Sequence, residues 1–315
     1  MRHFTSVDDI QNLETLLDIA QMHKQNPFAN EELGKRKTIG LLFFNPSLRT
    51  RLSTQKAASN LGMEAMVMNL DNEGWLLEFE DGVIMNGNKA EHIREAAQVV
   101  SQYCDILAVR SFPTLTDKQK DVSEQVISAF KKFASVPVIS LEGSSEHPLQ
   151  AVADALTIRE FKTKKRPKVV LTWAPHPKAL PHSVPNSFAK IMKLSDVDFV
   201  IANPEGYDLD PKISDGVKIV RNQDKALENA DFIYAKNWSS FEKYGQILSQ
   251  DLSWTITADK MKLTDSAKFM HCLPVRRNMI VNDEVLDSAS SIVIPQANNR
   301  TFATQAVLSE ILKSL

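Results

Sequence analysis

Short apolar runs alternate with segments of helical periodicity along the whole chain. In the first half, runs that predict buried strands stand at Thr38–Asn45, Ala65–Leu70, Asp105–Arg110 and Pro137–Leu141. The segments around them predict helices at 7–25, 50–61, His92–Gln102, 119–134 and 149–162. Gly62 is well placed to end the second of these helices. Because apolar strands that alternate with helices are typical of parallel sheets covered on both faces, this half predicts a parallel α/β unit.

The second half repeats this alternation after the basic stretch Lys162–Lys168. Its predicted strands are Val169–Trp173, Asp198–Ala202, Lys218–Val220, Phe232–Ala235, Lys268–His271 and Ser291–Ile294. Helices are predicted near 186–194, 223–229, 259–264 and 282–286, with a terminal amphipathic helix at 301–314. The fold class is therefore α/β with two parallel-sheet domains, one of residues 1–150 completed by the C-terminal helix 298–315, the other of residues 151–297.

One connection departs from the usual composition of a loop. Residues 174–185 read APHPKALPHSVP and contain four prolines. Proline fixes φ and lacks a backbone donor, so a stiff, extended loop is predicted. A plain surface connection and a functional loop remain equally open on this ground.

Composition narrows the class of protein. The chain of 315 residues has 43% hydrophobic and 24% charged residues and a formal net charge of −2, which is typical of a globular protein and argues against nucleic acid as the main partner. There is no long apolar run and no signal-peptide pattern, so we expect no membrane association. The two cysteines are too few for a disulfide framework, and a cytoplasmic location is expected. The 10 glycines form neither a dinucleotide fingerprint nor a P-loop, and no cofactor is expected.

The segment 47–51, Ser-Leu-Arg-Thr-Arg, lies directly between a predicted strand and a predicted helix. In a parallel sheet this is the carboxyl edge, where ligands bind, and a helix N-terminus attracts anions. Ser47 and Thr50 add hydroxyl groups, while Arg49 and Arg51 add charged donors. If this segment has only a structural role, its serine caps the helix and its two arginines are solvated. If it has a functional role, it forms a phosphate-binding site.

Two further strand ends carry groups suited to a ligand. His147 and Gln150 follow one predicted strand, and Arg110 ends another. Alone, a His-Pro turn or a single arginine is more often structural. Together with the segment 47–51 they predict a pocket for a small phosphorylated carbonyl compound, with His147 and Gln150 near the carbonyl oxygen.

The remaining histidines and cysteines carry weaker signals. Cys272 follows a strand beside His271, but neighbouring strand residues point to opposite faces, which disfavours thiolate catalysis. His176 and His182 lack partners at metal-ligand spacing, so no metal is predicted. His23 and His92 are expected on helix surfaces.

Four motifs give the chain a resemblance to a known family. The segments SLRTR at 47–51, HPLQ at 147–150, HCLPVRR at 271–277 and Asn299-Arg300 resemble the signatures of the aspartate/ornithine carbamoyltransferase superfamily in order and spacing. The triplet S-M-G of ordinary ornithine enzymes is missing. The region Tyr234–Trp238 and the proline-rich loop instead resemble the N-acylornithine branch.

This resemblance implies a role for each matching residue. Arg49, Arg110 and His147 are the expected catalytic groups. Carbamoyl phosphate is expected to bind Ser47, Leu48, Arg49, Thr50, Arg110, His147, Gln150, Arg300, the backbone of Cys272 and Leu273, and Trp75 of a neighbouring subunit. The acylornithine pocket is expected to contain Glu142, His176, Lys236, Arg276 and Ala90.

The resemblance also implies a reaction and an assembly. The expected reaction transfers the carbamoyl group to the δ-amine of N2-succinyl-L-ornithine in arginine biosynthesis, without a covalent intermediate. The acetyl-type enzymes resemble each other in a loop glutamate and a lysine where this chain has Ala90 and Ile280. Loss of that carboxylate suits an anionic succinyl group. The succinyl type usually has proline where Ala90 stands, so an acetyl substrate is an alternative, as is a silent carbamoyl-phosphate-binding subunit. A homotrimer and a trefoil knot with residues 174–185 as its rim are also implied.

Overall fold

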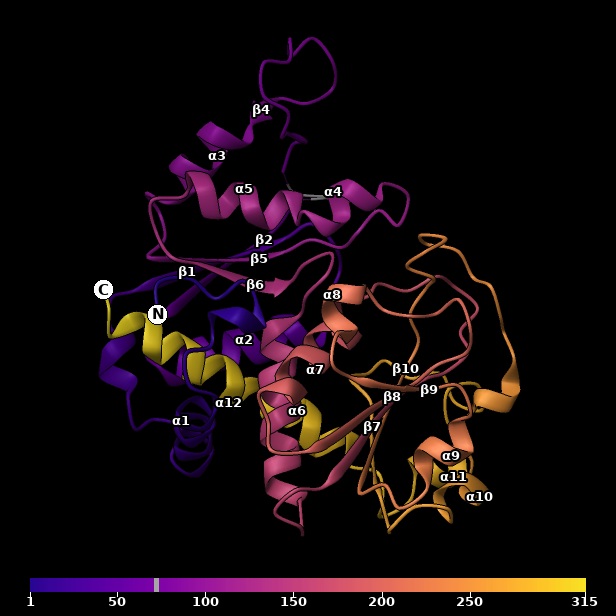
Figure 1. Cartoon of the computed structure of the whole chain (residues 1–315). Coiled ribbons are helices and arrows are strands. Elements are labelled where there is room, and N and C mark those ends of the chain that lie inside the picture. Colours follow the sequence, from indigo (N-terminus) through magenta and orange to yellow (C-terminus); the bar gives the residue numbers. More distant parts are fainter. Residues whose placement is uncertain (71–73) are drawn as a thin grey trace. The chain divides into compact units, whose positions relative to one another are not determined.

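The computed structural model describes residues 1–70 and 74–315. The chain divides into two compact units, one formed by Met1–Leu149 with Arg300–Leu315 and the other by Gln150–Asn299. Each unit is built around its own parallel sheet with helices on both faces, so the predicted fold class is confirmed (Figure 1).

The sheet of the first unit has the strand order β2-β1-β5-β6. Its strands are β1 (Thr38–Phe43), β2 (Glu64–Asn69), β5 (Ile106–Arg110) and β6 (Val138–Glu142), and every pairing is parallel. Burial alternates along the edge strand β2, whereas β5 and the other edge strand β6 are buried throughout. A small separate ribbon pairs β3 (Leu77–Glu78) with β4 (Glu91–His92).

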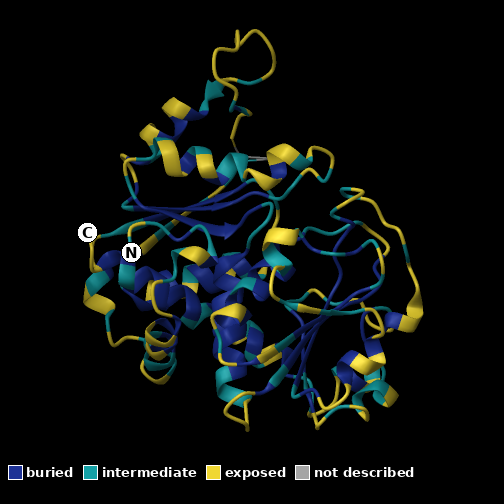
Figure 2. Ribbon diagram, in the orientation of Figure 1, coloured by how far each residue is buried: buried dark blue, intermediate teal, exposed yellow. Residues whose placement is uncertain are grey.

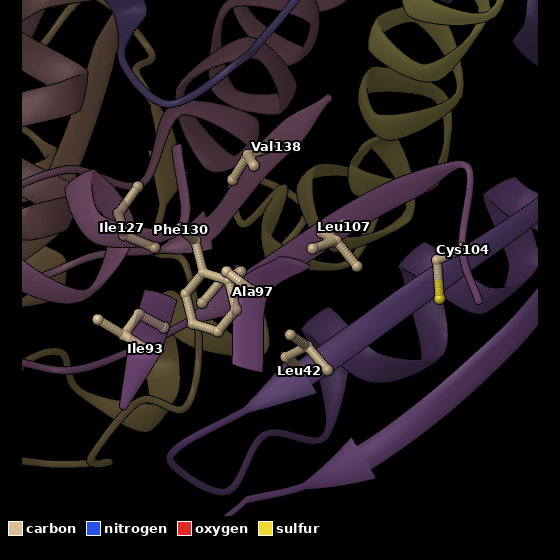
Figure 3. Packing of buried hydrophobic residues seen from close by; sticks show 9 residues of the cluster. Leu42, Ile93, Ala97, Cys104, Leu107, Ile127, Phe130 and Val138 are labelled. Carbon is tan, nitrogen blue, oxygen red and sulfur yellow. The ribbon is translucent and has the colours of Figure 1, made fainter. Parts of the chain in front are cut away.

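Helices cover both faces of this sheet (Figure 1). They are α1 (Leu13–Gln25), α2 (Arg49–Asn60), α3 (Ile93–Val100), α4 (Lys118–Val122) and α5 (Gln125–Phe133), with short 3-10 turns at Val7–Asp9 and Glu31–Gly34. Apolar side chains of α3 and α5 pack on the sheet around Leu42, Leu107 and Phe130 (Figure 3). Burial of these side chains is the main stabilising contribution to the unit. Gly62 ends α2 with φ of 77°, as its sequence position predicts.

The sheet of the second unit has the order β11-β10-β7-β8-β9. Its strands are β7 (Lys168–Trp173), β8 (Asp198–Ala202), β9 (Lys218–Val220), β10 (Phe232–Lys236) and β11 (Lys268–Met270). The helices are α6 (Pro148–Phe161), α7 (Ser183–Lys193), α8 (Pro211–Ser214), α9 (Gln223–Leu227), α10 (Ala258–Met261) and α11 (Asp283–Leu286), with a 3-10 turn at Leu252–Trp254. The helix α12 (Val293–Leu312) begins in this unit, and its residues from Arg300 onward belong to the first unit. The central strand β10 is buried throughout, and β7 is buried from Val169 onward (Figure 2).

The predicted strand Ser291–Ile294 is wrong. Only Ser291 pairs with Phe269, as an isolated bridge, and α12 begins at Val293. Pro295 lies in the first turn of that helix, where a missing N–H costs no internal hydrogen bond. The terminal helix therefore begins eight residues before its predicted start at residue 301.

Three other boundaries differ from the prediction. The segment 7–25 breaks after its 3-10 turn, because Asn12 caps a new helix through Thr15 N. The segment 119–134 breaks at Glu124, whose φ of 53° lies in the left-handed region. The proline-rich loop ends earlier than predicted, because Ser183–Pro185 already form the first turn of α7.

His23 is fully buried, so its predicted place on a helix surface is wrong. Its Nδ1 lies 3.0 Å from Gln305 Nε2 of α12, which covers this side of the first unit. Burial lowers the pKa of His23 to about 4. The tertiary packing of α12, which local periodicity does not reveal, determines this burial. Among the described residues no helix is long and apolar enough to cross a membrane.

Candidate active site

The carboxyl ends of three neighbouring strands form the polar edge of the first sheet. Because β1, β5 and β6 lie side by side, the residues that end or follow them meet at this edge. Arg110 is the last residue of β5, Glu142 is the last of β6, and Thr50 lies in the first turn of α2, which follows β1. The structure therefore brings Thr50, Arg110 and Glu142 together at this edge.

Thr50 is the point at which two arginines converge. Its Oγ1 accepts hydrogen bonds from Arg300 Nη2 at 2.5 Å and from Arg110 Nη1 at 3.3 Å. Arg110 also donates to Glu142 Oε2 at 2.5 Å. The four side chains are buried. Guanidinium groups held in this way away from water give a strong preference for an anion, since charged donors interact more strongly at low local dielectric.

His147 completes this group and is 2% exposed. Its Nε2 lies 3.4 Å from Arg300 Nη2 and 3.6 Å from Glu142 Oε2. Burial, helped by three neighbouring arginines and opposed by Glu142, lowers the pKa of His147 to about 3. The imidazole is therefore neutral at neutral pH, so it can donate one hydrogen bond and accept another without adding a positive charge to those of the three arginines.

The segment 47–51 begins α2 in the structure, with Leu48 as its N-cap residue and Arg49 as its first residue. Leu48 is 67% exposed, so its backbone rather than its side chain is suited to a ligand. Arg51 differs from Arg49, because its guanidinium lies 4.5 Å from the centroid of the Phe43 ring and donates to Asn69. Arg51 therefore stabilises the packing of α2, whereas Arg49 begins this helix.

A second polar network lies in the second unit around Asp154 of α6, which is fully buried. Asp154 Oδ1 accepts from Gln150 Nε2 at 2.8 Å and from Gln296 Nε2 at 2.7 Å. Gln296 Oε1 in turn accepts from the backbone N–H of His271 at 3.0 Å. The segment 271–274 is thus joined to α6 through side chains.

The backbone of the segment 271–274 is turned sharply. His271 Nδ1 accepts from Leu273 N at 2.8 Å, and Leu273 has φ of 56°. Cys272 is half-buried and forms no disulfide. The expectation that this segment acts through its backbone carbonyl groups stays a prediction.

The residues expected around an acylornithine are separated into two groups. His176 Nε2 accepts from Arg276 Nε at 3.0 Å, and Lys236 at the end of β10 donates to Asn237 O at 2.9 Å. These residues belong to the second unit, whereas Glu142 belongs to the buried cluster of the first. Removal from water, with help from Lys236 and Arg276, lowers the pKa of His176.

Trp75 and Ala90 lie next to the ribbon of β3 and β4. Trp75 is 59% exposed and donates from Nε1 to Glu91 at 2.8 Å. Ala90 is exposed as well, and its N–H bonds to Leu76 O. Within this unit both residues are therefore on the surface, not in the buried cluster. The expected contact of Trp75 with a ligand of a neighbouring subunit stays a prediction.

Sequence reasoning did not single out Asp154 or Gln296. A signal for Asp154 existed, because Gln150 and Asp154 stand four residues apart and so face the same side of a helix. Gln296 gave no such signal, since its partners lie more than 20 residues away in the sequence. Among the described residues, no group of three or more His, Cys, Asp or Glu side chains is arranged to hold a metal ion.

Two family models match the chain. Residues 2–160 match "Aspartate/ornithine carbamoyltransferase, carbamoyl-P binding domain", and residues 181–311 match "Aspartate/ornithine carbamoyltransferase, Asp/Orn binding domain". An N-succinylornithine carbamoyltransferase of Bacteroides thetaiotaomicron is 51% identical, with 100% of both chains covered. An N-acetylornithine carbamoyltransferase of Xanthomonas axonopodis is 36% identical, covering 99% of this chain and 96% of its own.

The solved structures that resemble this chain support the same family. The structure of an acetylornithine transcarbamylase complexed with acetylcitrulline has a TM-score of 0.93 at 36% identity and covers 99% of both chains. Two parallel-sheet units with an arginine-rich strand edge and a separate His-Cys-Leu-Pro loop define a carbamoyl-transferring enzyme. The chain belongs to the aspartate/ornithine carbamoyltransferase family.

Proposed function

We propose that this carbamoyltransferase transfers the carbamoyl group of carbamoyl phosphate to the δ-amine of N2-succinyl-L-ornithine, giving N-succinylcitrulline and phosphate. The buried group of Thr50, Arg110, His147 and Arg300 carries the proposal, because its geometry and charge suit a small phosphorylated carbonyl compound. The similarity to N-succinylornithine carbamoyltransferases supports the choice of acceptor. Arginine biosynthesis in the cytoplasm is the proposed setting.

Carbamoyl phosphate is proposed to bind through its phosphate and its carbamoyl group separately. Ser47, Arg49, Thr50, Arg300 and the backbone of Leu48 would hold the phosphate. Arg110 and His147 would contact the carbamoyl oxygen. The backbone carbonyl groups of Cys272 and Leu273 would accept from the carbamoyl NH₂, and Trp75 would come from a neighbouring subunit. The domains proposed from the sequence would divide accordingly, with residues 1–150 and 298–315 binding carbamoyl phosphate and residues 151–297 binding the acylornithine.

Gln150 is assigned to the NH₂ end rather than to the oxygen end. Its Nε2 donates to Asp154, and its Oε1 is buried and accepts no hydrogen bond from residues 1–70 or 74–315. Only this acceptor is left for a ligand. Gln150 therefore complements the carbamoyl NH₂ and not, as its residue type alone suggested, the carbamoyl oxygen.

The proposed reaction is a direct displacement. The neutral δ-amine attacks the carbamoyl carbon, a tetrahedral oxyanion forms, and the bond to the phosphate oxygen breaks. Arg49, Arg110 and the neutral His147 would stabilise the negative charge as it develops, which is commonly the largest contribution to catalysis at such sites. The departing phosphate would take the proton that the amine loses.

The acyl pocket is proposed to contain Glu142, His176, Lys236, Arg276 and, from a neighbouring subunit, Ala90. Solved structures of N-acetyl-L-ornithine transcarbamylase variants, in which a glutamate is replaced by alanine or proline, are complexed with carbamyl phosphate and N-succinyl-L-norvaline. We infer that this glutamate corresponds to Ala90. The uncharged Ala90 would then admit the succinyl carboxylate, which a glutamate would repel.

A comparison of acceptors tests the substrate. The purified chain is assayed with carbamoyl phosphate and N2-succinylornithine, N2-acetylornithine or ornithine, and the highest kcat/KM is expected with the succinyl compound. Ala90→Glu should shift the preference toward acetyl, while Asn88→Asp adds a similar charge two residues away and should leave it unchanged. A wild-type preference for acetylornithine would overturn the acyl assignment, and no turnover with any acceptor would indicate a silent binding subunit.

A homotrimer with shared active sites is tested by complementation. Arg49→Ala and Trp75→Ala are each expected to be weakly active alone. Mixed trimers should recover activity, because some sites combine the intact Arg49 of one chain with the intact Trp75 of another. Absence of recovery in verified mixed trimers would exclude sharing. The proposed knot around residues 174–185 is tested by the chain path in a crystal structure, and a path that can be pulled straight would refute it.

A further inference from the structure

We propose that Asp154 is a positioning residue that orients the Gln150 amide and the segment 271–273, and so makes the site selective for a ligand that carries an NH₂ group. This inference rests on the proposed binding of carbamoyl phosphate. It assigns a role to Asp154 and Gln296, which belong to neither of the residue sets expected to hold carbamoyl phosphate and the acylornithine.

The first step concerns the orientation of Gln150. A glutamine amide has a donor end and an acceptor end of similar shape, so sterics alone leave two orientations. A buried carboxylate offers acceptors only and therefore selects the donor end. Asp154 Oδ1 receives Gln150 Nε2 at 2.8 Å. The opposite orientation would place Gln150 Oε1 against the carboxylate, which is repulsive at low dielectric.

The second step concerns Gln296, which uses the same carboxylate oxygen. Its Nε2 donates to Asp154 Oδ1 at 2.7 Å, so its Oε1 faces the backbone N–H of His271 at 3.0 Å. His271 then accepts from Leu273 N through its own Nδ1. One carboxylate thereby determines the orientation of two amides and, through the second, the conformation of the turn that carries Cys272 and Leu273.

The third step is the consequence for a ligand. Once both amides are oriented, the groups offered by this part of the second unit are acceptors: Gln150 Oε1 and the carbonyl groups of the turn. Such acceptors favour an NH₂ group over an oxygen or a methyl group of the same size, because a ligand without donors leaves the buried acceptors unpaired. Asp154 therefore controls selectivity without contacting the ligand.

Asp154 is buried at the centre of the network, so its replacement must retain size. Asp154→Asn keeps the shape but can donate as well as accept, which releases Gln150 to turn its Nε2 toward the ligand. Two non-reacting analogues report the change. Phosphonoacetamide carries an NH₂ group at the carbamoyl position, whereas phosphonoacetate carries an oxygen there. Calorimetry of both with the intact trimer gives the ratio of their dissociation constants.

The wild-type protein is expected to prefer phosphonoacetamide, and Asp154→Asn should reduce this preference by about tenfold or more, as expected for one hydrogen-bonded acceptor that becomes a donor. The KM for the acylornithine should change little, while kcat falls. A preference that stays at the wild-type value in a folded Asp154→Asn trimer would overturn the proposal and leave Asp154 a purely structural role.

A second variant keeps the test decisive if Asp154→Asn does not fold. Gln296→Met leaves the Gln150–Asp154 hydrogen bond in place but removes the link from Asp154 to the turn. The preference for phosphonoacetamide should therefore fall, although the retained acceptor of Gln150 keeps part of it, and kcat should decrease as the turn loses its support. An unchanged preference in a folded Gln296→Met protein would contradict the role of Asp154 in holding the segment 271–273. Wild-type turnover is measured separately: an active enzyme without NH₂ preference refutes only the role of Asp154, whereas an inactive enzyme that binds neither analogue refutes the proposed function.

Discussion

The neutral state of His147 leads to a quantitative prediction for the stability of the protein. Its pKa is lowered from 6.5 to about 3 in the folded chain by burial and by three arginines. Below pH 6.5 the unfolded chain binds a proton at this position, while the folded chain does not. The contribution of His147 to stability is therefore present above pH 6.5 and is lost as the pH falls toward 3.

The size of the effect follows from the pKa difference. Each pH unit within this window lowers the free energy of unfolding by about 1.4 kcal/mol relative to a variant without the titrating group. At pH 4.5, two units below the unfolded value, the wild type should have lost about 3 kcal/mol relative to His147→Gln. The glutamine fills similar space and remains uncharged.

The measurement is urea unfolding of wild type and His147→Gln at pH 7.5, 6.0, 5.0 and 4.5, at one protein concentration and in buffers free of phosphate. The difference between the two free energies of unfolding should grow steadily in favour of the variant as the pH falls. His23→Gln is the matched comparison: the pKa of His23 is about 4, so this variant should show nearly the same effect as His147→Gln down to pH 4.5. Parallel curves for wild type and His147→Gln would show that His147 is protonated in the folded protein and refute the reasoning.

Three further predictions concern the two units. Thr50→Val removes the hydroxyl that accepts from Arg110 and Arg300 and should weaken carbamoyl phosphate binding about tenfold to a hundredfold. Thr54→Val is the control, because the Thr54 hydroxyl is buried without a hydrogen bond in the described part of the chain, and it should leave binding unchanged. Calorimetry measures both affinities, and equal affinities of the two variants would contradict the role of Thr50. Gly143→Ala should cost about 1–3 kcal/mol in urea unfolding, because a Cβ there collides with the Glu124 carboxylate, while Gly87→Ala meets open space and should be neutral. Cys272→Ala should retain kcat within about tenfold if only backbone carbonyls act, and complete inactivity would instead point to a thiolate.

The hydrogen bonds of the Glu124 carboxylate illustrate why local sequence patterns predict helices and strands better than the loops between them. Its carboxylate accepts from the backbone N–H groups of Ser144, Ser145 and Glu146 at 2.7–3.0 Å, and desolvation raises its pKa. These bonds hold the loop between Glu142 and His147. A partner some 20 residues away in the sequence leaves no trace in hydrophobic periodicity, so the break in the predicted helix 119–134 was not foreseen.

The terminal helix shows the same limit for an apolar run. Val293 and Ile294 are equally compatible with a short buried strand and with the start of a helix, since both place apolar residues in contact with a core. Their backbone groups find partners in α12, while only Ser291 pairs with β11. Tertiary packing therefore decided between two conformations that the local sequence allowed.

The sequence by itself determined the alternation of buried strands and helices, the start of α2 to within one residue, and the strand end that carries Arg110, because each of these depends on neighbours within a few residues. Only the tertiary structure decided that Thr50 serves two arginines, that His147 stays neutral, and that Asp154 orients Gln150 and Gln296. Those properties arise from burial and from hydrogen bonds between segments that are distant in the sequence. Neighbours in the folded chain, and not neighbours in the sequence, set the pKa of a side chain and decide which of its acceptor atoms a ligand can use.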